Sequence, residues 1–138
     1  MEIRHIAVAA AVLVAGLAGC SSPPAALGGT TAKVTIDGKD TGNPHNVRCS
    51  QTGWAWIIET PDKTKGFVAV IDTGDQLSAK SVDFRDFGGF TGTYWGKIGK
   101  AEVTGQGGNY TITGSADGNF TDNPSNAVTA TFRIEASC

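Results

Sequence analysis

The stretch VTATFRIEASC, residues 128–138, alternates apolar and polar side chains over its whole length. One phase is apolar or small and consists of Val128, Ala130, Phe132, Ile134, Ala136 and Cys138. The other phase is polar and consists of Thr129, Thr131, Arg133, Glu135 and Ser137. Because successive side chains of a β-strand point to opposite faces, this period of two predicts a half-buried strand of an antiparallel sheet.

Eight segments upstream also predict strands, and short polar or glycine-rich turns separate most of them. They are KVTID (33–37), HNVRCS (45–50), WAWIIE (54–59), GFVAVID (66–72), LSAKSVDF (77–84), FTGTYW (90–95), KAEVTG (100–105) and NYTITGSA (109–116). WAWIIE and GFVAVID are nearly continuous apolar runs, which favours central strands covered on both faces or strands at a sandwich seam. The pattern as a whole predicts an all-β domain, an antiparallel β-sandwich or partly closed barrel of about eight or nine short strands.

Size and charge restrict the class of protein further. The 138 residues suffice for one domain, and 19 glycines are typical of a turn-rich β fold. The formal net charge of −2 gives no basic field that would attract nucleic acid or anionic lipid, and no nucleic-acid partner is expected.

The N-terminus has a different composition and predicts export. Arg4 precedes a run that is apolar or small from Ile6 to Cys20 and is too short for a stable transmembrane helix. It ends on LAGC (17–20), which is similar to the bacterial lipobox, where the cysteine receives diacylglycerol before cleavage. The alternative is an ordinary signal peptide with an incidental cysteine. We therefore expect a lipoprotein signal peptide over residues 1–19.

Cys20 is then the predicted lipidation site, with the membrane as its partner. Two or three acyl chains form a lasting anchor because each buried CH₂ contributes about 0.8 kcal/mol. The segment SSPPAALGGTT (21–31) is rich in proline, glycine, serine and threonine, which predicts a tether. The expected organisation is a lipidated tether over 20–31 and a β domain over 32–138.

Cys49 and Cys138 lie on the apolar phase of their predicted strands. In the oxidising compartment outside the membrane, two such cysteines are expected to pair in a disulfide. One alternative is a catalytic thiol with His45 as base, but positions four apart on a strand are about 13 Å apart. The other is a metal site, for which the two histidines of the chain offer too few ligands.

The chain resembles the mycobacterial LpqH-type lipoprotein antigens. The motifs that carry this resemblance are LAGCSS (17–22), VTIDGKD (34–40), AKSV (79–82) and YTITGSADGNFTDNPSNAVTATFRIEASC (110–138). The resemblance implies a lipid-anchored envelope antigen whose acylated N-terminus is sensed by innate immune receptors. It also implies lipidation of Cys20 and the Cys49–Cys138 bridge, and it implies no enzyme activity.

The remaining candidate site is the segment DFRDFGGFTGTYWG (83–96), in which aromatic residues alternate with glycines. Its rings would line a cleft for an acyl chain or a glycan, or they would fill the core of a small domain. The candidate ligand-binding residues are Phe84, Phe87, Phe90, Tyr94 and Trp95. No nucleophile–base set, phosphate loop or metal-ligand spacing is visible, so no catalytic residue, metal or cofactor is predicted.

Two functions follow as hypotheses. The first is a lipoprotein antigen on the extracytoplasmic face of the cell membrane, with a structural or interaction role. The second is a carrier of an envelope lipid or glycolipid that uses the aromatic segment as its pocket.

Overall fold

The computed structural model describes residues 30–138, which form eleven β-strands. The strands are β1 Thr31–Ile36, β2 Lys39–Asp40, β3 His45–Asn46, β4 Arg48–Thr52, β5 Ala55–Glu59, β6 Gly66–Asp72, β7 Ser78–Phe87, β8 Phe90–Trp95, β9 Lys100–Gln106, β10 Asn109–Phe120 and β11 Asn123–Ser137. From residue 30 onward, no helix has the length and apolar character needed to cross a membrane. The predicted signal peptide and Cys20 lie outside the described residues.

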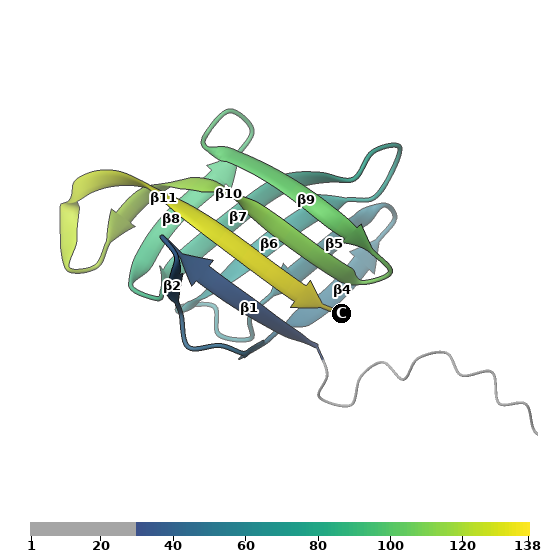
Figure 1. The fold of residues 1–138 in the computed structure, drawn as a ribbon, viewed down its shortest axis with the longest axis horizontal. Helices are drawn as coiled ribbons and strands as arrows, with labels where there is room; N and C mark the ends of the chain where they lie inside the picture. The colour runs from purple at the N-terminus through teal and green to yellow at the C-terminus, as the bar shows by residue number, and fades with distance from the viewer. Residues whose placement is uncertain (1–29) are drawn as a thin grey trace, which may run out of the picture.

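All strand pairs are antiparallel and belong to one sheet, with the order β2-β1-β11-β10-β8-β7-β6-β5-β4. In addition, β3 pairs with β1, and β9 pairs with β10. The sheet doubles over into two layers, so that β1, β11, β10 and β9 lie in front of β4 to β8 (Figure 1). The path stays open between β4 and β1. The predicted all-β antiparallel fold is confirmed, as an open two-layered sheet.

The long strand β10 carries the chain from one layer to the other. Residues 109–115 pair with β9, and residues 117–120 pair with β8. Gly114 and Gly118 stand on either side of this change of partner, and a Cβ on either one would collide with the backbone of β9 or β8. These two glycines therefore allow the neighbouring strands to approach β10 closely where the sheet folds over.

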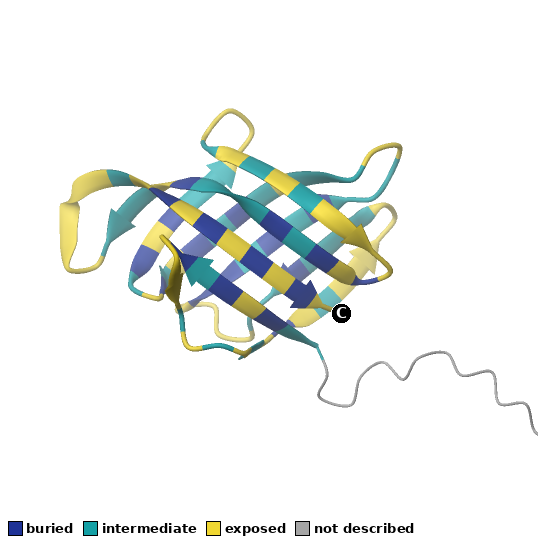
Figure 2. Cartoon of the chain, in the orientation of Figure 1, coloured by how far each residue is buried: buried dark blue, intermediate teal, exposed yellow. Residues whose placement is uncertain are grey.

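The core lies between the two layers and follows the predicted alternation. Figure 2 shows buried residues alternating with exposed or half-buried ones along β1, β11 and the first part of β10. In β11, Ala130, Phe132, Ile134 and Ala136 are all buried. Phe84 of the back layer contacts Phe132 of the front layer with ring centroids 5.3 Å apart.

Two details differ from the sequence-based expectation. The run GFVAVID is covered on one face only, because Phe67, Ala69 and Ile71 are buried whereas Val68 and Val70 are half-exposed on the outer face. The nine predicted segments all contain strands, but HNVRCS is divided into β3 and β4, and β2 was not predicted. Strands of two residues, such as β2 and β3, are too short to show a period.

The free edge of β1 is covered by the loop that follows it. β2 pairs with the end of β1 and β3 with its beginning, which leaves Val34 between them. The side-chain amide of Asn43 fills this gap, since its Oδ1 accepts a bond of 2.6 Å from Val34 N and its Nδ2 donates one of 2.9 Å to Val34 O. The amide thus takes the place of a strand residue and satisfies the backbone of a fully buried position.

Replacing this amide should destabilise the fold. We expect Asn43→Ala to lower the free energy of unfolding by about 1–3 kcal/mol, because the N–H of Val34 loses its partner. Chemical denaturation measures this difference. The matched control is Asn46→Ala, an exposed asparagine of strand β3 whose side chain takes no part in filling this gap, and it should change stability by less than about 0.5 kcal/mol. Equal losses in the two variants would contradict this role for Asn43.

Candidate functional site

The predicted pair Cys49–Cys138 is a disulfide in the structure, with Cα atoms 5.8 Å apart. It joins edge strand β4 to the residue that follows β11, where the sheet is open. Because the sulfur of Cys49 is bonded, a catalytic thiol at this position is excluded. The disulfide lines an open depression of about 520 Å³ together with Thr30 and Trp56, so the described chain begins beside the bridge.

The aromatic segment divides between the core and the surface. Phe84, Phe87 and Phe90 are at most 6% exposed and pack against one another, with Phe84 5.9 Å from Phe90 and 6.3 Å from Phe87. Tyr94 is half-buried and donates its hydroxyl to Ala79 O. Trp95 is 66% exposed. The structure therefore does not bring the five candidate ligand-binding residues together around one pocket, and binding by them stays a prediction.

A cleft does lie beside the glycines of this segment. It has a volume of about 240 Å³ and is formed by the β1–β2 turn, the β7–β8 turn and the β10–β11 hairpin. A neighbouring hollow of about 520 Å³ shares Lys39, Gly88, Phe120 and Asp122 with it. Phe120 is half-buried against Phe90, with ring centroids 5.2 Å apart, and gives the cleft an aromatic wall.

Hydrogen bonds hold the three turns of the cleft in place. Asp37 has φ of 50° at the start of an Asp-Gly turn, and its Oδ1 accepts a bond of 2.9 Å from Thr131 N. Thr121 N donates to Gly89 O at 2.8 Å, which ties the hairpin to the β7–β8 turn. Gly88, with φ of 60°, leaves room for Thr41, which a Cβ would approach to 2.7 Å. The cleft is preformed rather than dependent on loop movement.

The polar groups of the cleft are mainly acceptors. They are the carboxylates of Asp37, Asp40 and Asp122, with the ammonium of Lys39 among them. Backbone N–H bonds from Asn43 and Gly42 hold the pKa of Asp40 below its usual range and fix the orientation of its carboxylate. Within residues 30–138 no group of three His, Cys, Asp or Glu side chains is placed to hold a metal. Sequence reasoning missed this cleft, since its residues come from three turns far apart in the chain.

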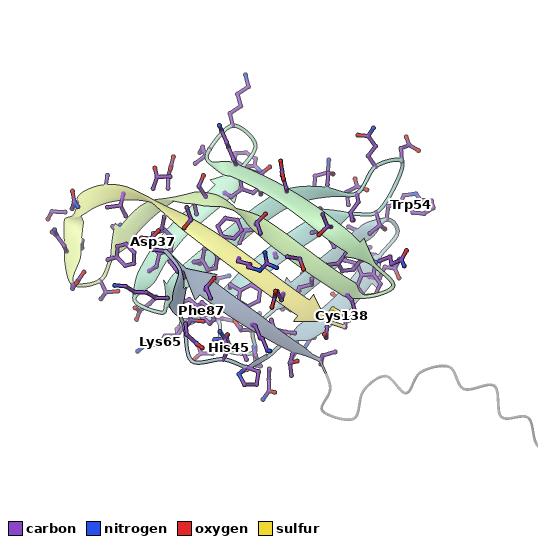
Figure 3. All side chains as sticks on the ribbon, in the orientation of Figure 1. Asp37, His45, Trp54, Lys65, Phe87 and Cys138 are labelled. Atoms are coloured by element: carbon purple, nitrogen blue, oxygen red, sulfur yellow. A yellow bond between two sulfur atoms is a disulfide. The ribbon has the colours of Figure 1, made fainter. Side chains whose placement is uncertain are left out.

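His45 does not line the cleft, but its side chain contacts Thr41, which does. Its Nε2 is 2.8 Å from Thr41 Oγ1, and its ring lies 4.5 Å from that of Phe87 (Figure 3). Partial burial lowers the pKa of His45, and the nearby Asp40 charge opposes this shift. Through these two contacts the imidazole connects the loop over β1 to the core.

Comparison with known proteins decides the family. The family model described as Mycobacterium 19 kDa lipoprotein antigen matches residues 25–138. The chain belongs to this family. It is 40% identical over 141 residues to a protein of Mycobacterium avium subsp. hominissuis (strain TH135) whose name contains the word lipoprotein, covering 100% of this chain and 97% of that protein. It is 37% identical over 155 residues to Lipoprotein LpqH of Mycobacterium tuberculosis (strain ATCC 25618 / H37Rv), covering 96% of each.

Membership of the 19 kDa antigen family confirms the resemblance seen in the sequence. The relatives carry names of lipoproteins rather than of enzymes. A lipoprotein is an envelope protein held by a lipid, which agrees with the LAGC motif at the end of the apolar N-terminal run.

In this family member the disulfide should contribute much of the stability. Its sequence separation of 89 residues predicts about 4–5 kcal/mol from the restricted unfolded chain. We expect the Cys49→Ser/Cys138→Ser double variant to lose about this amount in chemical denaturation, and reduced wild type to match it. Titration of the denatured, unreduced protein should detect no thiol from either cysteine. A reactive thiol at Cys49 or Cys138 would contradict the bridge.

Proposed function

We propose that this protein is a lipoprotein displayed on the extracytoplasmic face of the cell membrane, held there by acyl chains on Cys20. The signal peptide would comprise residues 1–19, the lipidated tether 20–31 and the folded domain 32–138. The observation that carries the proposal is family membership over residues 25–138 directly after a lipobox-like LAGC. The start of β1 at Thr31 supports it, because the fold begins where the predicted tether ends.

The domain itself would have a structural or interaction role without catalysis. Its disulfide and the hydrogen bonds of its turns would stabilise the folded domain outside the membrane. Host innate immune receptors are the proposed partners of the lipidated N-terminus, in line with the antigen description of the family. The β domain then serves to present its outer surface to other envelope or host molecules.

Metabolic labelling with an alkynyl fatty acid tests the anchor. Wild-type protein should take up the label and remain in the membrane fraction, whereas Cys20→Ala should lose the label because the acceptor sulfur is missing. Ser21→Ala is the matched control and should keep it. Label retained by Cys20→Ala would refute lipidation at this residue.

The cleft favours a second candidate function, binding of an envelope glycolipid through its sugar. Oriented carboxylates accept hydrogen bonds from sugar hydroxyls, and the ring of Phe120 offers an apolar surface to the C–H face of a sugar. Gly88 of the aromatic segment lines this cleft and Gly89 lines the neighbouring hollow, whereas Phe84, Phe87 and Phe90 are buried in the core.

Mass spectrometry of protein purified from its native host tests this candidate. We expect a co-purifying glycolipid with wild type and several-fold less with Asp122→Asn, whose carboxylate is exposed on the rim. Asp75→Asn, an exposed aspartate outside the cleft, is the control and should leave the amount unchanged. Absence of any co-purifying lipid would count against the carrier function.

A further inference from the structure

The turn between β8 and β9 has an unusual surface. Trp95 is 66% exposed and Ile98 is 45% exposed, and these are two of the three large apolar residues exposed in the described chain. Trp95 N donates to Ile98 O at 3.0 Å and Ile98 N to Trp95 O at 2.9 Å, so the two residues form an antiparallel pair. Side chains of such a pair lie on the same face of a hairpin. The tryptophan and the isoleucine therefore present one apolar face.

Two lysines lie beside this apolar pair, one in the turn and one at the start of β9. Lys97 and Lys100 are exposed, and residues 94–101 contain no aspartate or glutamate, although the chain as a whole is acidic. The residues across the ladder from Trp95 and Lys100 are Ser81 and Ser115, which carry no charge. No ion pair among the described residues involves Lys97 or Lys100, and the first acidic side chain after the turn is the exposed Glu102 of β9.

The turn also projects from the domain, so that its side chains can reach a flat surface. Gly96 has φ of 59° and starts a two-residue turn, so the backbone reverses tightly and the side chains project from its end. The loop stands out beyond the strands in Figure 1. A projecting pair of apolar side chains is too small for a protein interface, which buries about 800 Å² on each partner.

We propose that the β8–β9 turn is a second membrane contact, which places Trp95 and Ile98 in the interface of an anionic phospholipid bilayer. Tryptophan prefers this interface because its ring is apolar and its N–H can still be hydrated. Lys97 and Lys100 lie beside the pair and attract anionic headgroups within a Debye length of about 8–10 Å. This inference rests on the proposed function only in that the anchor on Cys20 keeps the turn near a bilayer.

The tether permits such a contact. Ten residue steps separate Cys20 from Thr30 and span at most about 33–36 Å. The anchor therefore does not by itself decide which face of the domain lies against the membrane. A basic, apolar turn on an otherwise acidic domain gives one orientation an advantage.

Trp54 provides a matched control within the same protein. It is 70% exposed at the β4–β5 turn and points away from the fold (Figure 3). Its carbonyl oxygen accepts bonds from the backbone and side chain of Thr73, in a turn that also carries Asp72 and Asp75. It matches Trp95 in residue type and exposure but has acidic instead of basic surroundings.

The test is fluorescence quenching of the mature acylated protein by brominated lipids. Vesicles contain brominated phosphatidylcholine with or without an equal amount of phosphatidylglycerol. Because the chain has three tryptophans, we expect quenching of up to about one third of the emission in anionic vesicles. Trp95→Phe should abolish this quenching. Trp54→Phe should keep the same absolute loss of emission, which is then up to about one half of the signal of the two remaining tryptophans. Lys97→Gln/Lys100→Gln and 0.5 M salt should each reduce it strongly.

Several outcomes overturn the contact. They are no quenching in the wild type, quenching that persists in Trp95→Phe, and equal quenching in neutral vesicles. Flotation of the same samples tests the anchor separately, since failure to float refutes the acyl anchor, whereas flotation without Trp95 quenching refutes only the turn contact.

Discussion

The open sheet depends on one covalent link between its two ends. Strand β4 does not pair with β1, so hydrogen bonds alone leave the path unclosed. The Cys49–Cys138 bridge ties β4 to the end of β11, and Val47 N donates to Thr30 O beside it. Because β11 pairs with both β1 and β10, this link holds both layers over the same core. The tether would leave the domain at this point, so any pull on an anchor acts where the fold is cross-linked.

The two edges of the sheet are protected in different ways. The edge of β1 is occupied by β2, the amide of Asn43 and β3 in succession. At the other end of the path, β4 is paired with β5 alone, but most of its residues are exposed and polar. Polar, charged edges resist pairing with other chains.

Alternation of side chains made most of this fold predictable. In FTGTYW the inner phase holds Phe90 and Tyr94, and the outer phase holds Thr93 and Trp95. The same rule that located the strand thus separates the exposed tryptophan from the core phenylalanine, although the sequence interpretation grouped the two as one candidate pocket. The two-residue strands, the open path and the cleft were not predictable, since they depend on contacts between distant turns. The bulge near Asp86, with φ of 41°, likewise has no periodic signal.

The distribution of charge and of exposed apolar side chains bears on how the domain would be oriented at the membrane. Its net charge is negative, which keeps most of the surface away from anionic headgroups. The stretch 94–101 carries two exposed lysines and no acidic residue, and it adds exposed apolar side chains, so we expect attraction to anionic headgroups at this projecting turn. An acyl anchor provides affinity for the membrane but does not set the orientation of the domain. A weak contact at one turn adds little affinity but can set that orientation. With the β8–β9 turn against the bilayer, the cleft formed by the turns at Asp37, Gly88 and Phe120 belongs to other parts of the surface, and ligand binding there does not compete with membrane contact.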